Sequence, residues 1–264
     1  MARAIGLAAL TVLDVAPPEQ VALAAEAGFS HVGLRLIPAT PEEVRHPVVG
    51  DTPMVREIER RLADTGVQVL DVEIFRLTPD VRIADFEPAM AIAARLGARL
   101  MLVAGNDPDA ARLRDSFARL SEATSRYGLT ACLEPMPWTD TPTIAAARRV
   151  IDGAPGASGV LVDAIHFFRA DNRLAELADI VPAQLPYMQL CDAPAACPTE
   201  RAELIRQARS DRLFPGEGGL DLRGLMQALP PDIPVSLEIP IARPMPPLDR
   251  ARHALQAARR ILVG

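Results

Sequence analysis

The chain contains no lysine: all 28 of its basic residues are arginine. Without lysine, an enzyme cannot form a Schiff base with a carbonyl substrate, use an amine as its base or build a phosphate-binding P-loop. Lysine-dependent aldolases, barrel enzymes with a lysine base and P-loop nucleotide hydrolases are therefore excluded. Chemistry that uses carboxylates, histidine or a metal ion remains.

Long apolar runs are absent as well. No segment reaches the roughly 18 apolar residues that a membrane-spanning helix needs, so we expect no membrane insertion. The stretch from Ile5 to Leu13 resembles the apolar part of a secretory signal, but Asp14 and the helix start PPEQ interrupt it. The three cysteines form no CxxC pair, which is typical of reduced thiols. We therefore expect a cytoplasmic protein.

Blocks of like charge are a third absence. The formal net charge is −6 without any such block, which argues against nucleic acid as a partner. The hydrophobic content of 49% is ample for a core, and 264 residues is close to the roughly 250 residues of a (β/α)8 barrel. No linker, repeat or low-complexity segment divides the chain, so we expect one domain over residues 1–264.

Short leucine-rich or β-branched runs alternate with longer segments of helical spacing, which is typical of parallel βα units. The expected strands are 4–10, 31–36, 67–74, 98–104, 129–134, 158–163, 186–191 and 234–239. The expected helices are 17–28, 51–65, 85–97, 108–127, 141–152, 171–180, 199–209 or 221–229, and 247–262. Eight such units predict the α/β class and a single (β/α)8 TIM barrel.

Four oxygen-bearing side chains lie at the ends of expected strands. They are Glu134 in LTACLE, Asp163 in GVLVD, Gln189 in PYMQL and Glu238 in PVSLE. The carboxyl ends of barrel strands converge on one rim, where these groups would repel one another unless a cation joined them. Hard oxygen donors suit Mn²⁺ or Mg²⁺, with Co²⁺ or Zn²⁺ as alternatives, so we expect one divalent ion. Taken singly, each carboxylate could instead pair with an arginine.

Further polar residues are expected on the same rim. The candidates for substrate binding are Arg35, Glu73, Arg76, Trp138, Arg212, Glu217 and Arg243. Arginine matches carboxylate or phosphate in a bidentate manner, which favours an anionic substrate. Glu73 could be an acid or base or pair with Arg35 or Arg76, and Trp138 could line the pocket or pack in the core. The glycines of PGEGG could hold a phosphate through backbone N–H groups or form a tight turn.

The expected metal also indicates a reaction. A metal that bridges a carbonyl and a neighbouring hydroxyl acidifies the proton between them. A carboxylate or histidine at the edge of the metal can then remove that proton. The candidate catalytic residues are Glu134, Glu238 and His166, which follows Asp163 in a D-x-x-H segment. Capping of a helix or packing in the core are the alternatives for His166.

The segments LEPMPW, LVDAIHFF, QLCDAP, RLFPGEGGLDL and VSLEIP together resemble the xylose-isomerase-like barrel superfamily of sugar (phosphate) isomerases and epimerases. The resemblance covers essentially the whole chain and implies a metal-binding barrel. Many members bind the metal through Glu, Asp, His and Glu, whereas this chain has Gln189 in place of the histidine. The set E/D/Q/E with DxxH, QL-x-DAP and R-x-FPGEG is more similar to the 3-dehydroshikimate dehydratase branch. However, the second strand ends GLRLIP, where that branch tends to have an acidic residue.

The sequence thus predicts a divalent-metal-dependent isomerase or epimerase that removes a proton next to the carbonyl of a small, sugar-like substrate. The alternatives are a metal-dependent dehydratase of the 3-dehydroshikimate dehydratase type and a non-catalytic, metabolite-binding barrel. An abasic-site endonuclease is disfavoured, because such enzymes use more histidine ligands than the four histidines here supply. The expected partner is a carbohydrate-like or cyclic polyhydroxy-ketone molecule, and a homo-oligomer is compatible with the sequence.

Overall fold

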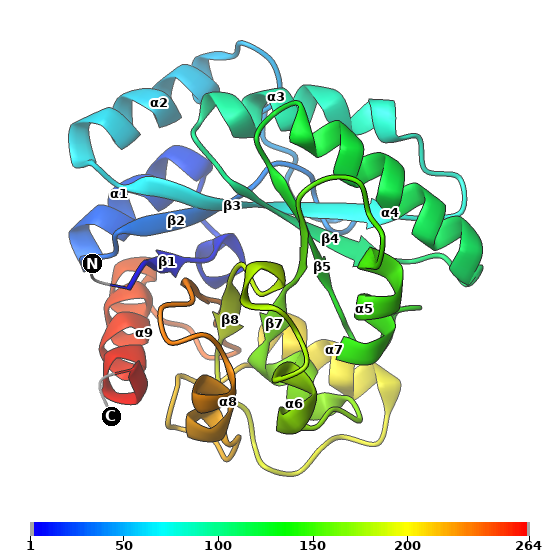
Figure 1. Cartoon of the computed structure of the whole chain (residues 1–264). Helices are drawn as coiled ribbons and strands as arrows, with labels where there is room; N and C mark the ends of the chain where they lie inside the picture. Colours follow the sequence, from blue (N-terminus) through cyan, green and yellow to red (C-terminus); the bar gives the residue numbers. More distant parts are fainter. Residues whose placement is uncertain (1–2, 263–264) are drawn as a thin grey trace.

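The strands of the chain form one parallel sheet that curves into a barrel, with helices packed around it (Figure 1). The computed structural model describes residues 3–262, so residues 1–2 and 263–264 of the expected domain lie outside the described part. The hydrogen-bonded strand order is β6-β5-β4-β3-β2-β1-β9-β8-β7. Because β6 and β7 are consecutive pieces of one segment, the sheet returns to its starting point. The predicted (β/α)8 TIM barrel is confirmed.

All eight expected strands are present. Their bounds are β1 Ile5–Leu7, β2 His31–Arg35, β3 Gln68–Leu77, β4 Leu100–Gly105, β5 Thr130–Glu134, β6 Ser158–Val160, β7 Val162–Asp163, β8 Met188–Leu190 and β9 Val235–Leu237. The segment expected as one strand at 158–163 is divided at Leu161, whose backbone N–H donates to the carbonyl of Leu133 (3.0 Å). β3 continues beyond its expected end at 74, so Glu73 lies within the strand rather than at its end.

The helices follow the strands and cover the outside of the barrel. They are α1 Pro17–Ala27, α2 Pro53–Thr65, α3 Glu87–Arg95, α4 Ala110–Ser125, α5 Ile144–Ile151, α6 Ala164–Arg169, α7 Arg201–Ser210, α8 Leu222–Ala228 and α9 Pro247–Leu262. The stretch that resembled a secretory signal forms β1 and the short 3-10 turn Ala9–Val12 that precedes α1. Both segments proposed as alternatives, 199–209 and 221–229, are helical, as α7 and α8.

The helix expected at 171–180 is wrong. Short 3-10 turns at Leu174–Leu177 and Pro182–Gln184 replace it, and α6 forms directly after β7 instead. The helix α6 starts early because the carboxylate of Asp163 caps its first turn. The early end of α6 is stabilised by Asn172, whose side-chain amide donates to the carbonyl of Phe167 (3.1 Å). This change places the first turn of α6 on the rim of the barrel.

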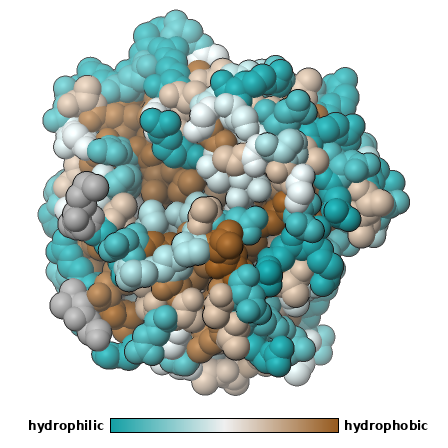
Figure 2. Space-filling view, viewed as in Figure 1, coloured by the Kyte–Doolittle hydropathy of each residue, from teal (hydrophilic) through white to brown (hydrophobic). Residues whose placement is uncertain are grey.

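Apolar side chains fill the space between the strands and the helices and also the barrel interior below the rim. The interior cluster consists of Leu70, Ile74, Leu100, Leu102, Ala104, Cys132, Met136, Leu161 and Tyr187. Figure 2 shows hydrophilic residues over most of the visible face, with apolar residues surfacing in patches between them. Within residues 3–262, no helix has the length and apolar character needed to cross a membrane.

Candidate active site and metal centre

The carboxyl ends of the strands surround a pocket of about 190 Å³. Its polar lining residues are Arg35, Glu43, Glu73, Arg76, Glu134, His166, Arg209, Arg212 and Glu238. Its larger apolar lining residues are Leu10, Leu13, Ile74, Leu102, Met136 and Trp138. Ligand pockets for drug-sized molecules usually measure about 300 to 1,000 Å³, so this pocket suits a small metabolite.

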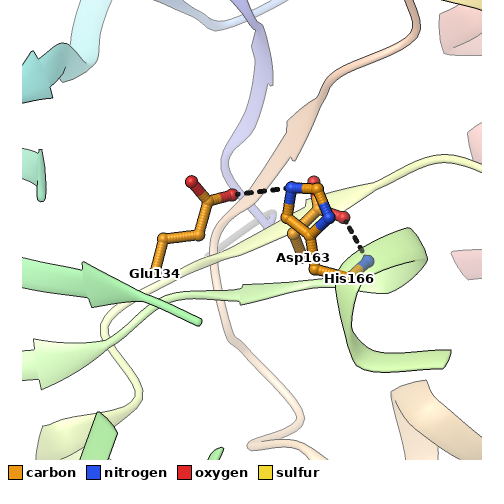
Figure 3. A group of neighbouring side chains, drawn as sticks. All are labelled: Glu134, Asp163 and His166. Carbon is orange, nitrogen blue, oxygen red and sulfur yellow. Dashed lines mark hydrogen bonds and ion pairs between the residues drawn. The ribbon is translucent and has the colours of Figure 1, made fainter. Parts of the chain in front are cut away.

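Glu134, Asp163 and His166 form one buried cluster at this rim (Figure 3). Their potential ligand atoms lie within 4.8 Å of one another. Glu134 ends β5 and its Oε1 is 3.6 Å from Nε2 of His166. Asp163 ends β7, and its Oδ1 accepts the backbone N–H of His166 (3.1 Å). The D-x-x-H spacing is therefore one capped helical turn that returns the imidazole towards Glu134.

Gln189 and Glu238 extend the cluster from β8 and the end of β9. Nε2 of Gln189 donates to Oε1 of Glu238 (3.0 Å). Arg212 joins two of the carboxylates, because Nη1 donates to Oδ2 of Asp163 (2.6 Å) and Nη2 lies 2.8 Å from Oε2 of Glu238. Each of these side chains, and Glu134 beside them, belongs to a residue at most 4% exposed. Of the four expected metal ligands, the structure thus places Glu134 and Asp163 in one potential metal site with His166. Gln189 and Glu238 contact each other, and Arg212 links Glu238 to Asp163.

When all three of its carboxylates are ionised, negative charge exceeds positive charge in this cluster. Ionised Glu134, Asp163 and Glu238 carry −3 and Arg212 carries +1, which leaves −2. Burial raises the pKa of Glu134 well above its usual range, and the nearby charges of Asp163 and Glu238 raise it further. Burial also raises the pKa of Glu238 to about 8, although Arg212 opposes this shift. Burial acts in the same direction on Asp163, but Arg212 and His166 outweigh it, so the pKa of Asp163 is lowered.

A divalent ion fits these residues. It would balance the remaining charge of −2, and one oxygen in the cluster lacks a partner. Oε1 of Gln189 is buried and accepts no hydrogen bond from any described residue. A buried acceptor without a partner costs about 1–3 kcal/mol, a penalty that coordination to a cation removes. Carboxylate and amide oxygens are the donors that hard divalent cations prefer.

His166 packs against a neighbouring aromatic ring and also lines the pocket. Its ring packs edge-on against Trp138, with 4.9 Å between the ring centroids, and both residues line the pocket. The helix cap is supplied by Asp163 and not by the imidazole. Burial lowers the pKa of His166 to about 4, so the imidazole is neutral at neutral pH. A neutral imidazole beside Glu134 can accept a proton.

Glu73 pairs with Arg35, which was one of the alternatives for it. Nη2 of Arg35 lies 3.0 Å from Oε1 of Glu73, and Nη1 lies 2.8 Å from Oε1 of Glu43. Burial opposes the charge of Arg35, but these two carboxylates outweigh it and raise the pKa of the guanidinium above its usual value. The guanidinium of Arg35 is therefore paired with carboxylates of the protein itself. Glu43, in the loop after β2, has no strand-end position that would have indicated it in the sequence.

Arg76 and Arg209 differ from Arg35 because neither forms an ion pair within residues 3–262. Nη1 of Arg76 donates to the side-chain oxygen of Asn106 (3.1 Å). Burial lowers the pKa of Arg76, and the positive charge of Arg209 lowers it further. Both arginines line the pocket. The sequence did not indicate Arg209, since it belongs to α7 and only folding brings it to the rim.

Two expected substrate-binding residues do not reach the pocket. Glu217 is exposed, and its carboxylate pairs with Nε2 of His253 on α9 (2.8 Å). Arg243 is also exposed, with its guanidinium carbon 5.8 Å from the centre of the Phe214 ring. Glu217 comes after α7 and Arg243 comes after β9. The segments that carry them lie over the outside of the barrel next to α9.

The phosphate-cradle interpretation of PGEGG is corrected by the structure. The backbone N–H groups of Gly216 and Gly218 both donate to Oδ2 of Asp192, at 2.9 and 3.0 Å. These groups already hold a carboxylate of the protein itself. The tight-turn alternative is therefore the right one.

Comparisons with known proteins agree with this architecture. Residues 21–261 match a family model described as a xylose isomerase-like TIM barrel. A 3-dehydroshikimate dehydratase of Pseudomonas aeruginosa is 26% identical in an alignment of 223 residues that covers 79% of this chain and 33% of that protein. The chain thus spans about a third of the length of this curated relative.

Solved structures show the same fold. The IolI protein, whose crystal structure contains a zinc atom, is 16% identical and superposes with a TM-score of 0.80 over 99% of this chain and 98% of its own. A 3-keto-D-glucoside 4-epimerase from E. coli is 19% identical, with a TM-score of 0.74 over 98% of this chain and 100% of its own. Since the family model covers most of the sequence, the protein belongs to the xylose isomerase-like TIM barrel family.

Proposed function

We propose that this protein is a divalent-metal-dependent lyase that removes water from a small hydroxy-ketone carrying a carboxylate. The observation that carries the proposal is an asymmetry within the cluster. Within residues 3–262, no arginine pairs with the Glu134 carboxylate, and its nearest basic side chain is the imidazole of His166 (3.6 Å). Both oxygens of Glu238 are engaged, one by Gln189 and one by Arg212. Glu134 and His166 can therefore transfer a proton, whereas Glu238 is held in place by its two partners.

The ion would be held by Glu134, Asp163, Gln189 and Glu238. Mn²⁺ or Mg²⁺ is favoured by the oxygen donors, with Co²⁺ or Zn²⁺ as alternatives. When bound, such an ion polarises the substrate carbonyl and lowers the pKa of the proton on the neighbouring carbon. Arg212 keeps Asp163 ionised and opposes the protonation of Glu238, because its guanidinium contacts both carboxylates.

Glu134 and His166 would handle the proton as a pair. Because burial keeps the pKa of His166 at about 4, the imidazole is neutral in the resting enzyme and cannot begin as the acid. The pair must first take the proton from the carbon next to the carbonyl. The protonated pair can then deliver it to the hydroxyl on the adjacent carbon, which leaves as water while a carbon–carbon double bond forms.

Trp138 would support this step by fixing the imidazole. The indole packs edge-on against the His166 ring and helps to close the pocket. A fixed imidazole within reach of both carbons lets one proton leave and return on the same face of the substrate. Dehydration needs no second acid or base on the opposite face, which agrees with the engaged state of Glu238.

The carboxylate of the substrate is inferred from Arg76 and Arg209. Both guanidinium groups line the pocket without an ion-pair partner among the described residues. Two like charges at such a site repel each other, and an anion between them removes the repulsion while accepting charge-assisted hydrogen bonds. A 3-dehydroshikimate-like molecule has the required carbonyl, hydroxyl and carboxylate, and the curated relative is named as a dehydratase of that compound.

Isomerisation or epimerisation, which the sequence alone ranked first, is the second candidate. Glu134 and Glu238 both line the pocket and both have raised pKa values from burial, so each could exchange a proton. Epimerisation would require Glu238 to release Gln189 or Arg212 during turnover. A non-catalytic barrel that binds a metabolite is the remaining alternative.

The decisive experiment is incubation of the metal-loaded protein in D₂O with 3-dehydroshikimate, with ketoses and with ketose phosphates. Deuterium at the carbon next to the carbonyl and the ultraviolet absorbance of a conjugated or aromatic product are followed together. An absorbing product that disappears in His166→Ala supports the lyase. A deuterated epimer or aldose without absorbance supports the isomerase instead, and metal occupancy without any turnover supports the non-catalytic barrel.

A further inference from the structure

The loop of residues 213–220 closes around one buried carboxylate, that of Asp192. Besides Gly216 and Gly218, which donate to Oδ2, the backbone N–H groups of Leu220 (3.2 Å) and Ala193 (2.8 Å) donate to Oδ1. Asp192 is only 1% exposed. Converging backbone N–H groups of this kind form an anion-binding nest, and here the nest is filled by the protein itself.

The glycines of the loop are required by this arrangement. A Cβ atom on residue 218 would lie 2.3 Å from Oδ1 of Asp192 and 2.3 Å from the carbonyl oxygen of Ala193. Gly216 has a φ of +87°, which favours glycine. The loop sequence is therefore matched to the carboxylate at position 192.

The same aspartate fixes the backbone at the start of the loop. Its backbone N–H donates to the carbonyl of Leu213 (2.8 Å), and the N–H of Leu213 donates back to the carbonyl of Asp192 (2.9 Å). Asp192 thus holds Leu213 directly through its backbone and the rest of the loop through its side chain. Residue 212, which precedes this pair, has its own N–H bonded to the carbonyl of Pro240 (2.8 Å).

The side chain of Arg212 extends from this hydrogen-bonded backbone segment. Its guanidinium lies between Asp163 and Glu238, and Nε donates to the carbonyl of Ala208 (2.6 Å). A planar guanidinium that contacts two carboxylates tolerates little displacement, since its donors point in fixed directions. Movement of the backbone at 212 would therefore separate it from at least one carboxylate of the cluster.

We propose that Asp192 is a positioning residue for the metal site. It holds the segment from which Arg212 reaches Asp163 and Glu238, and it thereby sets the spacing of the oxygens that receive the divalent ion. Asp192 itself touches neither the pocket nor the expected ligands. This role rests on the proposed function, because it assumes that the cluster binds a metal.

The test is the Mn²⁺ affinity of Asp192→Asn, measured from free Mn²⁺ by electron paramagnetic resonance. Asparagine keeps the shape of the side chain but turns an NH₂ group towards backbone N–H donors. Loss of a residue that hydrogen-bonds a metal ligand typically reduces metal affinity by about 10- to 100-fold. Because Asp192 acts through Arg212, we expect a loss of about 10-fold, at the low end of this range, while circular dichroism shows the native fold. Asp221→Asn is the matched control, since Asp221 also accepts a backbone N–H, from Gly224 (2.9 Å), but caps α8 and has no link to Arg212.

A double variant tests whether Asp192 acts through Arg212. If it does, Asp192→Asn combined with Arg212→Lys binds Mn²⁺ no more weakly than Arg212→Lys alone. Additive losses would overturn the proposed route. If Asp192→Asn does not fold, Gly216→Ala replaces it, because this change disturbs the same nest and leaves the carboxylate intact. We expect Gly216→Ala to lose Mn²⁺ affinity to a smaller extent. Unchanged affinity would contradict the proposal.

The role of Asp192 and the binding of a metal are tested separately by these measurements. Wild-type protein that binds Mn²⁺, together with an Asp192→Asn variant of equal affinity, would overturn the role of Asp192 and leave the proposed function intact. Wild-type protein that binds no divalent ion would overturn both.

Discussion

Nη1 of Arg212 lies 2.6 Å from Oδ2 of Asp163, in an ion pair whose two side chains are at most 2% exposed. Arg212 was expected to bind substrate, yet its guanidinium is directed to a carboxylate of the protein. The pair stabilises an ionised aspartate in a place where burial alone would favour the neutral acid. Arg212 therefore belongs to the machinery that prepares the metal site.

Replacement of Arg212 by leucine should strongly destabilise the metal-free protein. Removing one partner of a buried ion pair leaves an uncompensated charge and typically costs about 3–5 kcal/mol. We expect a loss of this size in the free energy of unfolding, measured by urea denaturation. Saturating Mn²⁺ should recover part of it, because the cation takes over the charge balance.

Arg206→Leu is the control for this measurement. Arg206 pairs with Glu203 on the surface of α7, where both side chains are more than 40% exposed. Such exposed pairs contribute about 0–1 kcal/mol. Equal losses of unfolding free energy in the two variants would show that the buried Arg212 pair stabilises the protein no more than an exposed pair.

Metal binding should strengthen as pH rises towards 8. Burial raises the pKa of Glu238 to about 8 in the metal-free protein, so Glu238 carries a proton at pH 6 to 7. The ion must displace that proton, and its apparent affinity should increase from pH 6 to about 8 and then level off.

Calorimetric titrations with Mn²⁺ in buffers of different ionisation enthalpy count the protons released. Release should be largest near pH 6 to 7 and should decline above pH 8. Proton release and affinity that do not change over this range would refute the raised pKa of Glu238.

Among the ligands, charge should matter more than identity. Glu134→Gln should reduce activity by about 10²- to 10⁴-fold, as expected for loss of an acid–base group, and Glu238→Gln should also be severe. Gln189→His should cost less, because it exchanges one neutral ligand for another. Activities are compared at matched metal occupancy, and equal losses in all three variants would contradict the ranking.

Arg76 and Arg209 should recognise the anionic group of the substrate. A hydrogen bond to a charged group contributes about 1.5–3 kcal/mol, so Arg76→Ala or Arg209→Ala should raise KM for an acidic substrate about 10- to 100-fold. KM for its neutral amide should change little. Arg243→Ala is the control, since Arg243 is exposed outside the pocket. An unchanged ratio of the two KM values would remove the anionic substrate from the account.

The main features of the barrel could be predicted because strand ends and helix starts are local signals. Glu134 and Asp163 were placed correctly at strand ends, since the end of a parallel strand determines which rim a residue joins. The expected helix at 171–180 failed for a tertiary reason. Asp163 and Asn172 make side-chain hydrogen bonds that start and end α6 early, and periodicity does not record such bonds.

The site could be predicted less completely than the fold. Glu43 and Arg209 reach the pocket from a loop and a helix, where the sequence gives no directional signal. Arg212 was recognised as a site residue. The sequence does not show whether its guanidinium binds a carboxylate of the protein or one of the substrate, and this decides its role. Glu217 shows the opposite error, because it was expected on the rim yet pairs with His253 on the outside of the barrel.

The proposed activity depends on one divalent ion held by Glu134, Asp163, Gln189 and Glu238. The most direct test removes all metal by chelation, confirms the fold by circular dichroism, and measures metal content and water elimination as Mn²⁺ is added back. We expect no activity without metal, and full recovery at one ion per chain. Full activity in exhaustively metal-free protein would contradict this expectation.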